Sequence, residues 1–357
     1  MTRIRPITLN DGEVINAVRT RNALPGIDPV EWRKWCLDFP YREEFKEIPI
    51  GWILESDTGP VGVLSNVPML YELDGQPIRA GIADAWAVDP AHRNASLQLM
   101  NAYFAQKGID LHLIGSASPA VSRVLALLRM QCIPAPGYDE PLLWPVRYRT
   151  FAAAALRRRG APVPGVLAWP AGLVLGAAAL ARRSNGRRLG EVRRSASFDE
   201  RFDGFWSRIR CGHTRLRAVR TSAVLRWRFQ NELQNGSATI LVHENGGEVQ
   251  GYVVLLRRFL AHLRLTMCDV ADLQAVDDDP SVLRSLLAAG LRLAKEEGAE
   301  GFKFVAGEGA KRAVALSLRP YSYHLDSWQL FYKVREAGLA AALAGPAAWD
   351  FSPFDTF

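Results

Sequence analysis

Residues 83–96 read Ala83-Asp84-Ala85-Trp86-Ala87-Val88-Asp89-Pro90-Ala91-His92-Arg93-Asn94-Ala95-Ser96, and this stretch decides the fold. A mostly apolar run, typical of a strand, leads through Asp89-Pro90 into the start of a helix. A helix start offers unpaired N–H groups and the positive end of the helix dipole, and small side chains let an anion approach them. Because Arg93 adds charge-assisted hydrogen bonds, the stretch predicts an anion-binding turn. The alternative is an ordinary strand-to-helix turn with a surface arginine.

The order of elements around this stretch occurs twice in the chain. Each copy begins with a hairpin of β-branched runs joined by a short turn rich in Gly, Asn or Asp. A third strand, a helix and a fourth strand follow. These segments are 51–55, 60–67, 79–88, 95–107 and 110–114 in the first copy, and 238–243, 249–256, 262–273, 280–297 and 301–305 in the second. The sequence therefore predicts an α/β (α+β) fold with two mixed, mostly antiparallel twisted sheets flanked by helices.

This repeat predicts an N-terminal domain over residues 1–148 and a C-terminal domain over residues 196–357. The linker between them, 149–195, is rich in Arg, Ala and Pro, and its apolar part predicts a helix over 171–183. Because prolines and glycines interrupt the apolar run, we expect this helix to pack between the domains or to lie on a membrane surface rather than to span a bilayer.

Net charge is +7, from 44 Lys and Arg against 37 Asp and Glu, and much of the arginine lies between Arg157 and Arg220. This basic band suits anionic partners such as CoA phosphates, RNA or a membrane surface, and the alternative is a solvated linker. No specific nucleic-acid partner is expected, and the oligomeric state stays open. We expect a cytoplasmic protein, because no apolar signal segment follows Met1, with peripheral membrane contact through 157–194 as an open alternative. Scattered cysteines and histidines predict free thiols and no metal site.

The run Val88-Asp89-Pro90-x-x-Arg93, followed by a helix, resembles the acyl-CoA motif of the Gcn5-related N-acetyltransferase (GNAT) superfamily, Val-x-Pro-x-x-Arg with a Q/R-x-x-G-x-G/A loop. The hairpin before it and the segment 110–119 after it resemble the second, third and fifth strands of that fold and its splayed segment. The likeness extends from about residue 3 to residue 144. The sequence departs from the family pattern where Ser96 and Gln98 replace small glycine-type residues, and where Ser118 replaces a common asparagine.

The second copy departs further from the family pattern. Asp277-Asp278-Asp279-Pro280 stands where the basic, glycine-rich turn is expected. Carboxylates repel a diphosphate, and Asp279 before Pro280 is a natural cap for the next helix. The resemblance thus implies two tandem GNAT-like domains, of which only the first binds CoA in the usual way.

The resemblance also implies the chemistry. It implies transfer of an acyl group from acyl-CoA, acetyl-CoA in the simplest case, to the amine of a small molecule or of a sugar or amino-acid precursor. Asp84 is by position the candidate base, since apolar neighbours favour a raised pKa, and Tyr138 is the candidate acid. A structural strand-end aspartate and a loop aromatic that covers the core are the alternatives. The candidate donor-binding residues are Val88, His92, Arg93, Asn94, Ala95, Ser96, Ser116 and Ser118.

Two other functions stay open at this level. The chain also resembles, distantly, the Fem-type transferases, which pair two such domains and take their donor from aminoacyl-tRNA. A non-catalytic GNAT-like binding protein in a polysaccharide or cell-envelope pathway would fit the altered glycine positions. The sequence does not identify the acceptor, because acceptor loops vary on one scaffold.

Overall fold

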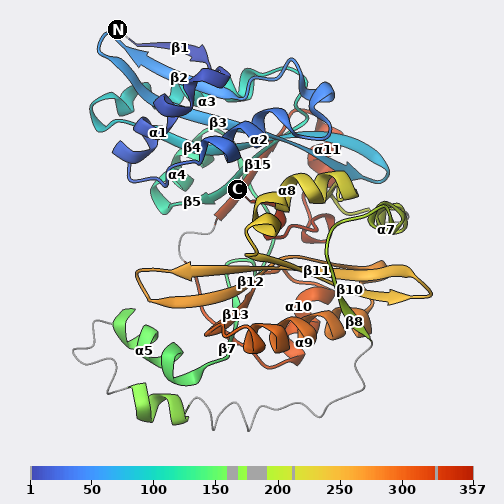
Figure 1. Cartoon of the computed structure of the whole chain (residues 1–357). Helices are drawn as coiled ribbons and strands as arrows, with labels where there is room; N and C mark the ends of the chain where they lie inside the picture. The colour runs from blue at the N-terminus through green and yellow to red at the C-terminus, as the bar shows by residue number, and fades with distance from the viewer. Residues whose placement is uncertain (1, 159–167, 175–190, 211–213, 326–328, 357) are drawn as a thin grey trace.

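The computed structural model describes residues 2–158, 168–174, 191–210, 214–325 and 329–356. In this part of the chain the strands form two twisted mixed sheets, one above the other in Figure 1. The strands of the first sheet are β1 (Arg3–Pro6), β2 (Gly51–Ser56), β3 (Gly59–Leu73), β4 (Gln76–Val88), β5 (Leu111–Ala117), β6 (Gln131–Cys132), β9 (Arg217–Ala218) and β15 (Gln329–Val334). Those of the second are β7 (Leu142–Pro145), β8 (Val192–Ser195), β10 (Ala238–Asn245), β11 (Glu248–Leu260), β12 (Leu265–Ala275), β13 (Gly301–Phe304) and β14 (Tyr321–Ser322).

The two sheets repeat one arrangement of strands. The first runs β1-β2-β3-β4-β5-β15-β6, with β9 beside β3, and the second runs β14-β7-β13-β12-β11-β10-β8. In each, a hairpin and a third strand pair antiparallel, and the third strand pairs parallel with the strand that follows the helix. The predicted fold class, with its two mixed sheets and its repeated β-β-β-α-β order, is confirmed.

The two sheets also share strands across the halves of the chain, which the repeat did not predict. β7 comes from the first half of the chain but pairs with β13 of the second sheet. β15 comes from the second half but pairs with β5 of the first sheet. The expected domain limits 1–148 and 196–357 therefore do not coincide with the limits of the sheets, because the first sheet includes β9 and β15 from the second half of the chain and the second sheet includes β7 from the first half.

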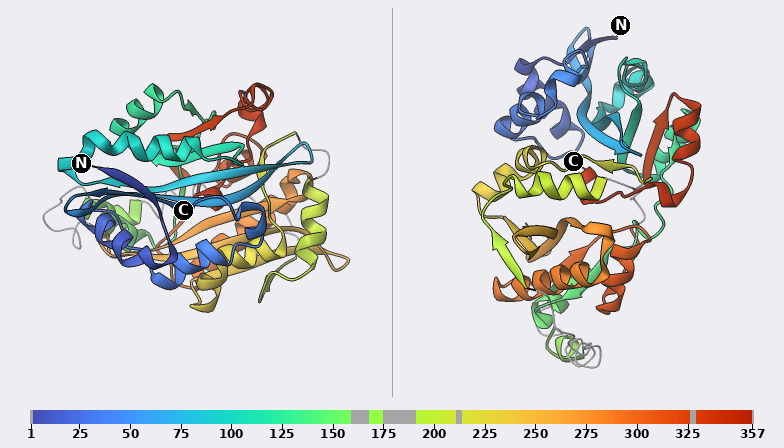
Figure 2. Two further views of the ribbon diagram at one scale, coloured as in Figure 1. Left: turned by 90° about the horizontal axis from the view of Figure 1, so that it is seen from above. Right: turned by 90° about the vertical axis from the view of Figure 1, so that its right-hand side faces the viewer.

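The helices lie on the outer faces of the sheets and between them (Figures 1 and 2). Their bounds are α1 (Gly12–Arg21), α2 (Pro29–Leu37), α3 (Ser96–Ala105), α4 (Pro119–Leu127), α5 (Tyr148–Arg158), α7 (Arg201–Arg210), α8 (Ser222–Gln234), α9 (Pro280–Glu296), α10 (Ala310–Ser317) and α11 (Ala337–Ala342). Short 3-10 helices are η1 (Leu9–Asp11), η2 (Arg42–Phe45), η3 (Pro90–Ala95), η4 (Val276–Asp278), η5 (Pro346–Ala348) and η6 (Pro353–Asp355).

The largest hydrophobic core lies between the two sheets. Aromatic side chains of α7 and α8, among them Phe202 and Trp227, pack there against β3 of the first sheet and β11 of the second. The C-terminal segment enters the same core with Phe354, which is fully buried. Figure 1 and the right-hand view of Figure 2 place α8 and the C-terminal end between the sheets. Burial of this apolar surface joins the two sheets into one body.

The linker region is only partly described. Residues 168–174 form a short helix whose Leu173 and Val174 are exposed, and residues 175–183 of the predicted apolar helix lie outside the described residues. In the described part of the chain, no helix combines the length and the apolar character needed to cross a bilayer. Cys36, Cys132 and Cys268 are free thiols.

Candidate functional site

The first sheet opens next to the turn that the sequence singled out. β4 and β5 pair in parallel, and this pairing ends at Ala83↔Ile114 although β4 continues to Val88 and β5 to Ala117. We call the space between these two strand ends the β4-β5 opening. β4 also bulges there, because Ala85 and Trp86 lie together opposite a single residue of β3, and Ala85 has φ of 53°. Bulges are enriched near active sites, where they redirect side chains.

The turn after β4 is a 3-10 helix, η3, that continues directly into α3. The N–H of His92 donates to the carbonyl of Asp89 at 2.8 Å, and the N–H of Ser96 donates to the carbonyl of Arg93. Two of the amides expected to face an anion are therefore bonded within the turn. Among the described residues, no side chain caps the start of η3 or of α3, so the remaining terminal amides keep their positive polarity.

The α1 helix holds this turn in place. Arg21 binds the Asp89 carboxylate with Nη2 at 2.9 Å and also donates to the carbonyl of Pro60 at 2.8 Å. Asn22 donates to the other oxygen of Asp89 at 2.9 Å. Arg21 at the end of α1 and Asn22 just after it thus position the turn, and nothing in the sequence distinguishes them from ordinary helix-end residues.

The candidate donor residues differ in their access to solvent. Gln98, the bulky departure from the family pattern, donates from its amide to the hydroxyl of Thr2 at 3.2 Å. Exposure of Arg93 leaves its guanidinium accessible to a phosphate. Val88 and Ala95 are buried, His92 and Ser96 are half-buried, and Arg93 and Asn94 are exposed.

The two candidate serines, Ser116 near the end of β5 and Ser118 just after it, are described to different extents. Ser118 is the N-cap of α4: its hydroxyl accepts from the N–H of Val121 at 3.4 Å, and its carbonyl accepts from the hydroxyl of Ser122 at 2.9 Å. This capping role is the structural alternative to a contact with the pantetheine arm. The side chain of Ser116 lies outside the described residues.

Asp84 does not meet the apolar surroundings that its sequence neighbours suggested. It lies on β4 at the start of the β4-β5 opening, where Arg19 of α1 donates from Nη1 to its Oδ2 at 2.7 Å. Arg19 is itself mostly buried and also donates to the carbonyl of Pro25 at 2.6 Å. The apolar expectation fails because α1 folds over this end of β4 and brings a cation that the strand pattern does not contain.

Tyr138 lies in the core between the sheets, not in the β4-β5 opening beside Asp84. It is 1 % exposed and packs edge-on against Phe351 of the C-terminal segment, with ring centroids 5.4 Å apart. Burial, and then the nearby charge of Asp355, raise the pKa of Tyr138 well above its usual value. Its position matches the core-covering alternative that the sequence left open.

The corresponding turn of the second sheet is acidic and already occupied. Asp279 caps α9 by accepting from the N–H groups of Ser281 and Val282 at 2.7 and 3.3 Å, as the sequence predicted. Asp278 is 8 % exposed and forms an ion pair with Arg215. This turn thus offers carboxylates and a capped helix start, where the first sheet has a helix start without a side-chain cap and an exposed Arg93.

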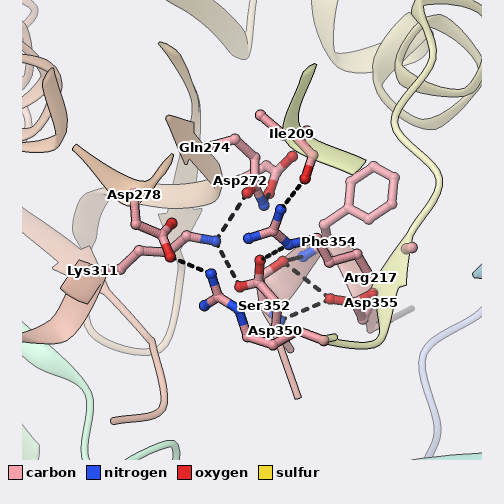
Figure 3. A network of polar contacts seen from close by, with 12 residues as sticks. Ile209, Arg217, Asp272, Gln274, Asp278, Lys311, Asp350, Ser352, Phe354 and Asp355 are labelled. Atoms are coloured by element: carbon pink, nitrogen blue, oxygen red, sulfur yellow. Dashed lines mark hydrogen bonds and ion pairs between the residues drawn. The ribbon is translucent and has the colours of Figure 1, made fainter. Parts of the chain in front are cut away.

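A buried ionic network lies between the two sheets and was not predicted (Figure 3). Arg220 is fully buried and donates from Nε to Asp272 of β12 at 2.9 Å, and Tyr252 donates to the same carboxylate at 2.6 Å. Asp355 of the C-terminal segment lies 3.7 Å from Arg220. Burial raises the pKa of the Asp355 carboxyl to about 6, although Arg220 acts in the opposite direction.

A second part of the network centres on Asp350. It binds Arg217 at 2.8 Å and Lys311 at 2.7 Å, and Lys311 donates also to Gln274 at 3.0 Å. Burial alone would raise the pKa of Asp350, but these two cations outweigh it and hold the pKa well below its usual value. Arg217 and Arg220 belong to the basic band of the sequence, so part of that band is internal and paired rather than available to an anionic partner.

Comparison with known proteins identifies the fold. No protein-family model matches the chain, and no curated protein sequence matches it. Solved structures do match: a GCN5-related N-acetyltransferase from Kribbella flavida is 12% identical with a TM-score of 0.55, over 94% of this chain and 71% of that one. One from Anabaena variabilis is 10% identical with a TM-score of 0.55, over 94% and 73%. N-myristoyltransferase of Saccharomyces cerevisiae, solved with bound myristoyl-CoA and inhibitors, is 12% identical with a TM-score of 0.56, over 93% and 79%.

These likenesses extend over both sheets, so the whole described chain has the fold of the GCN5-related N-acetyltransferases, in an arrangement similar to two such units in tandem. At identities of 10–12%, they show the fold and not the activity. Within the described residues, no group of three or more His, Cys, Asp and Glu side chains has the arrangement of a metal site.

Proposed function

We propose that the chain is an acyl-CoA-dependent N-acyltransferase, with acetyl-CoA as the simplest donor and the amine of a small molecule as acceptor. The observation that carries the proposal is the β4-β5 opening, where parallel pairing ends at Ala83↔Ile114 while both strands continue. Strands that separate in this way expose backbone N–H and C=O groups, which an extended chain such as the pantetheine arm can pair with. The fold shared with N-acetyltransferases supports the same reading.

The donor diphosphate is proposed to bind at the uncapped start of η3 and α3, with His92, Asn94, Ala95 and Ser96 beside it. Arg93 is exposed at this turn and supplies the charge-assisted hydrogen bonds. Val88, buried at the end of β4, is proposed to supply an apolar contact there. Ser116 and Ser118 are proposed as contacts of the pantetheine arm, although the hydroxyl of Ser118 is engaged in capping α4.

Titration with acetyl-CoA by calorimetry tests the donor site. Arg93→Glu replaces an attraction with a repulsion at the diphosphate and is expected to weaken binding by tenfold or more, about 1.4 kcal/mol or above. Arg292→Glu makes the same change on an exposed position of α9 and should leave binding unchanged. Equal loss in both variants, or no acetyl-CoA binding by the unaltered protein, would contradict the proposal.

Asp84 is proposed as the base of the transfer. Tyr138, the acid that the resemblance implied, lies in the core away from the β4-β5 opening, so Tyr138→Phe is expected to keep its activity. The amine must lose a proton and the departing thiolate must gain one, and positioned groups contribute about 10²–10⁴-fold to such steps. Asp84→Asn should therefore lower the rate of transfer strongly while leaving the affinity for acetyl-CoA unchanged. Tyr138→Phe keeps the ring against Phe351 and removes only the hydroxyl. Full activity in Tyr138→Phe would remove this residue from the mechanism.

The Fem-type alternative differs in its donor and is separated by the same titration. Binding of aminoacyl-tRNA in place of acetyl-CoA would favour that class, and binding of neither would favour a non-catalytic module. Acyl-CoA donors of increasing chain length should be compared, because N-myristoyltransferase, which shares the fold, is solved with myristoyl-CoA.

A further inference from the structure

A cavity of about 270 Å³ lies between the two sheets, and we call it the intersheet pocket. It begins where the parallel pairing of β12 and β13 ends, at Asp269↔Lys303. Leu256 of β11 and Val270 and Ala271 of β12 form one wall. Leu330 of β15 and Pro353 and Thr356 of the C-terminal segment form the other. Its volume is below the usual range of about 300–1,000 Å³ for drug-sized ligands, which suits a molecule of the size of an amino acid or a monosaccharide.

The intersheet pocket lies next to the β4-β5 opening of the first sheet. Gly115 of β5 borders that opening, and a side chain added at Gly115 would point at Thr356, 3.5 Å away, and at Leu330, 3.9 Å away. Both of these residues line the pocket. A single layer of side chains therefore separates the pocket from the strand along which the donor is proposed to lie.

The charges that line the pocket are mainly positive. Arg228, Arg258 and Lys303 face one carboxylate, Asp269, which is paired with Lys303 at 3.1 Å. Arg258 is exposed, while Arg228 is half-buried and donates from Nη2 to the carbonyl of Thr356 at 2.9 Å. Glu232 and Glu31 also act on Arg228 but do not line the pocket. Guanidinium groups in such partly desolvated places bind carboxylate or phosphate through paired hydrogen bonds.

From this placement and charge we propose that the intersheet pocket is the acceptor site, and that the acceptor is a small amine which also carries an anionic group, a carboxylate or a phosphate. The inference rests on the proposed acyltransferase function. The acceptor nitrogen attacks the thioester carbonyl, the new C–N bond forms as the C–S bond breaks, and the proton lost by the amine ends on the CoA thiol. The anionic group is held by Arg228 and Arg258, which fixes the amine toward Gly115 and the donor.

Binding of matched probes tests the proposal without depending on turnover. Glucosamine 6-phosphate is compared with glucosamine, and L-amino acids are compared with their C-terminal amides, by calorimetry with and without CoA. At least one anionic member should bind tenfold or more tightly than its uncharged counterpart, and the phosphate and carboxylate arms distinguish the two kinds of anion. Equal binding within both pairs, or no binding by any probe, would overturn the proposal.

Two neighbouring arginines on β11 provide the variant and its control. Arg258→Glu should weaken binding of the anionic probe tenfold or more and raise its KM in acyl transfer, while acetyl-CoA affinity stays unchanged. Arg257 is exposed too but points to the other face of the strand, away from the pocket, so Arg257→Glu should have little effect. Equal weakening by both substitutions would overturn the proposal.

Separate titrations keep the two proposals distinct. Failure of the donor-site proposal appears as failure of the protein to bind acetyl-CoA, whether or not it binds the acceptor probes. Failure of the acceptor proposal appears as acetyl-CoA binding and transfer that do not distinguish anionic from neutral amines. Probe binding that depends on Arg258 in a protein unable to bind acetyl-CoA would likewise refute the acceptor role.

Discussion

Arg220→Met tests whether the buried ionic network holds the two sheets together. Arg220 is fully buried, donates to Asp272, to the carbonyl of Ala218 at 2.8 Å and to the hydroxyl of Ser352 at 3.1 Å, and lies over the ring of Phe354. Methionine preserves most of the apolar stem but leaves two buried carboxylates, Asp272 and Asp355, without their cation. Removing one partner of a buried ion pair costs about 3–5 kcal/mol, which sets the expected loss of unfolding free energy.

The loss should be measured by urea unfolding at pH 7.5 and pH 5, in each case relative to the unaltered protein. The pKa of Asp355 is about 6, so at pH 5 this carboxyl is mostly protonated already and leaves less uncompensated charge. The effect of Arg220→Met should therefore be smaller at pH 5 than at pH 7.5.

Arg201→Met is the matched control. Arg201 is 40% exposed and pairs with Asp199 and Glu244 at the surface, where such pairs contribute about 0–1 kcal/mol. If the two variants lost the same stability, or if the loss in Arg220→Met grew at pH 5, the network would not have the role inferred from its burial.

Three further outcomes follow from single contacts. The pKa of Asp355 in the folded protein, about 6, lies above its ordinary value of 3.8, so this carboxyl makes the unfolding free energy fall as the pH rises from about 4 to 6. Asp355→Asn should remove about 3 kcal/mol of that fall, measured by urea unfolding across this pH range. Ser118→Ala removes the cap of α4 and should cost about 0.5–2 kcal/mol in urea unfolding, whereas a drop in acetyl-CoA affinity would reveal a donor contact instead. Gly51→Ala would drive a Cβ into the carbonyl of Leu64 at a φ of +145°, and we expect more than about 2 kcal/mol of destabilisation. A melting temperature like that of the parent would show that β2 can shift.

Local periodicity was enough to predict most elements of the sheets. The hairpins and third strands follow from β-branched runs and turn residues, which act over a few positions and need no information about distant partners. The cap at Asp279 was also predicted, because an aspartate before a proline meets the needs of a helix start by itself.

The strand exchange could not be predicted in the same way. The segments 142–145 and 329–334 are short apolar runs, and nothing local specifies which sheet they join. Pairing partners are decided by where the chain crosses between the sheets, which is a property of the whole topology. A repeated order of elements does not show that each copy completes its own sheet, and here β7, β9 and β15 join the sheet of the other half.

The candidate site was predicted as a location but not in its ionic detail. The turn after Val88 was found from its residues, whereas Arg19 and Arg21 reach it from α1, more than sixty residues earlier. Burial of Arg217 and Arg220 was missed because a charge count treats a paired internal arginine and a surface arginine alike. The one available signal was Asp272 within an apolar strand, since a buried carboxylate requires a cation.

The exchange of β7 and β15 affects both the synthesis of the chain and its response to proteolysis. During synthesis from the N-terminus, the edge of β5 in the first sheet stays unpaired until residues 329–334 have emerged from the ribosome. An edge exposed for so long invites pairing with another nascent chain. In the folded protein, the same exchange should hold the two halves together after proteolysis. A cut between Arg158 and Glu191 would leave two fragments, each of which contributes a strand to the sheet of the other, so they should remain associated during gel filtration.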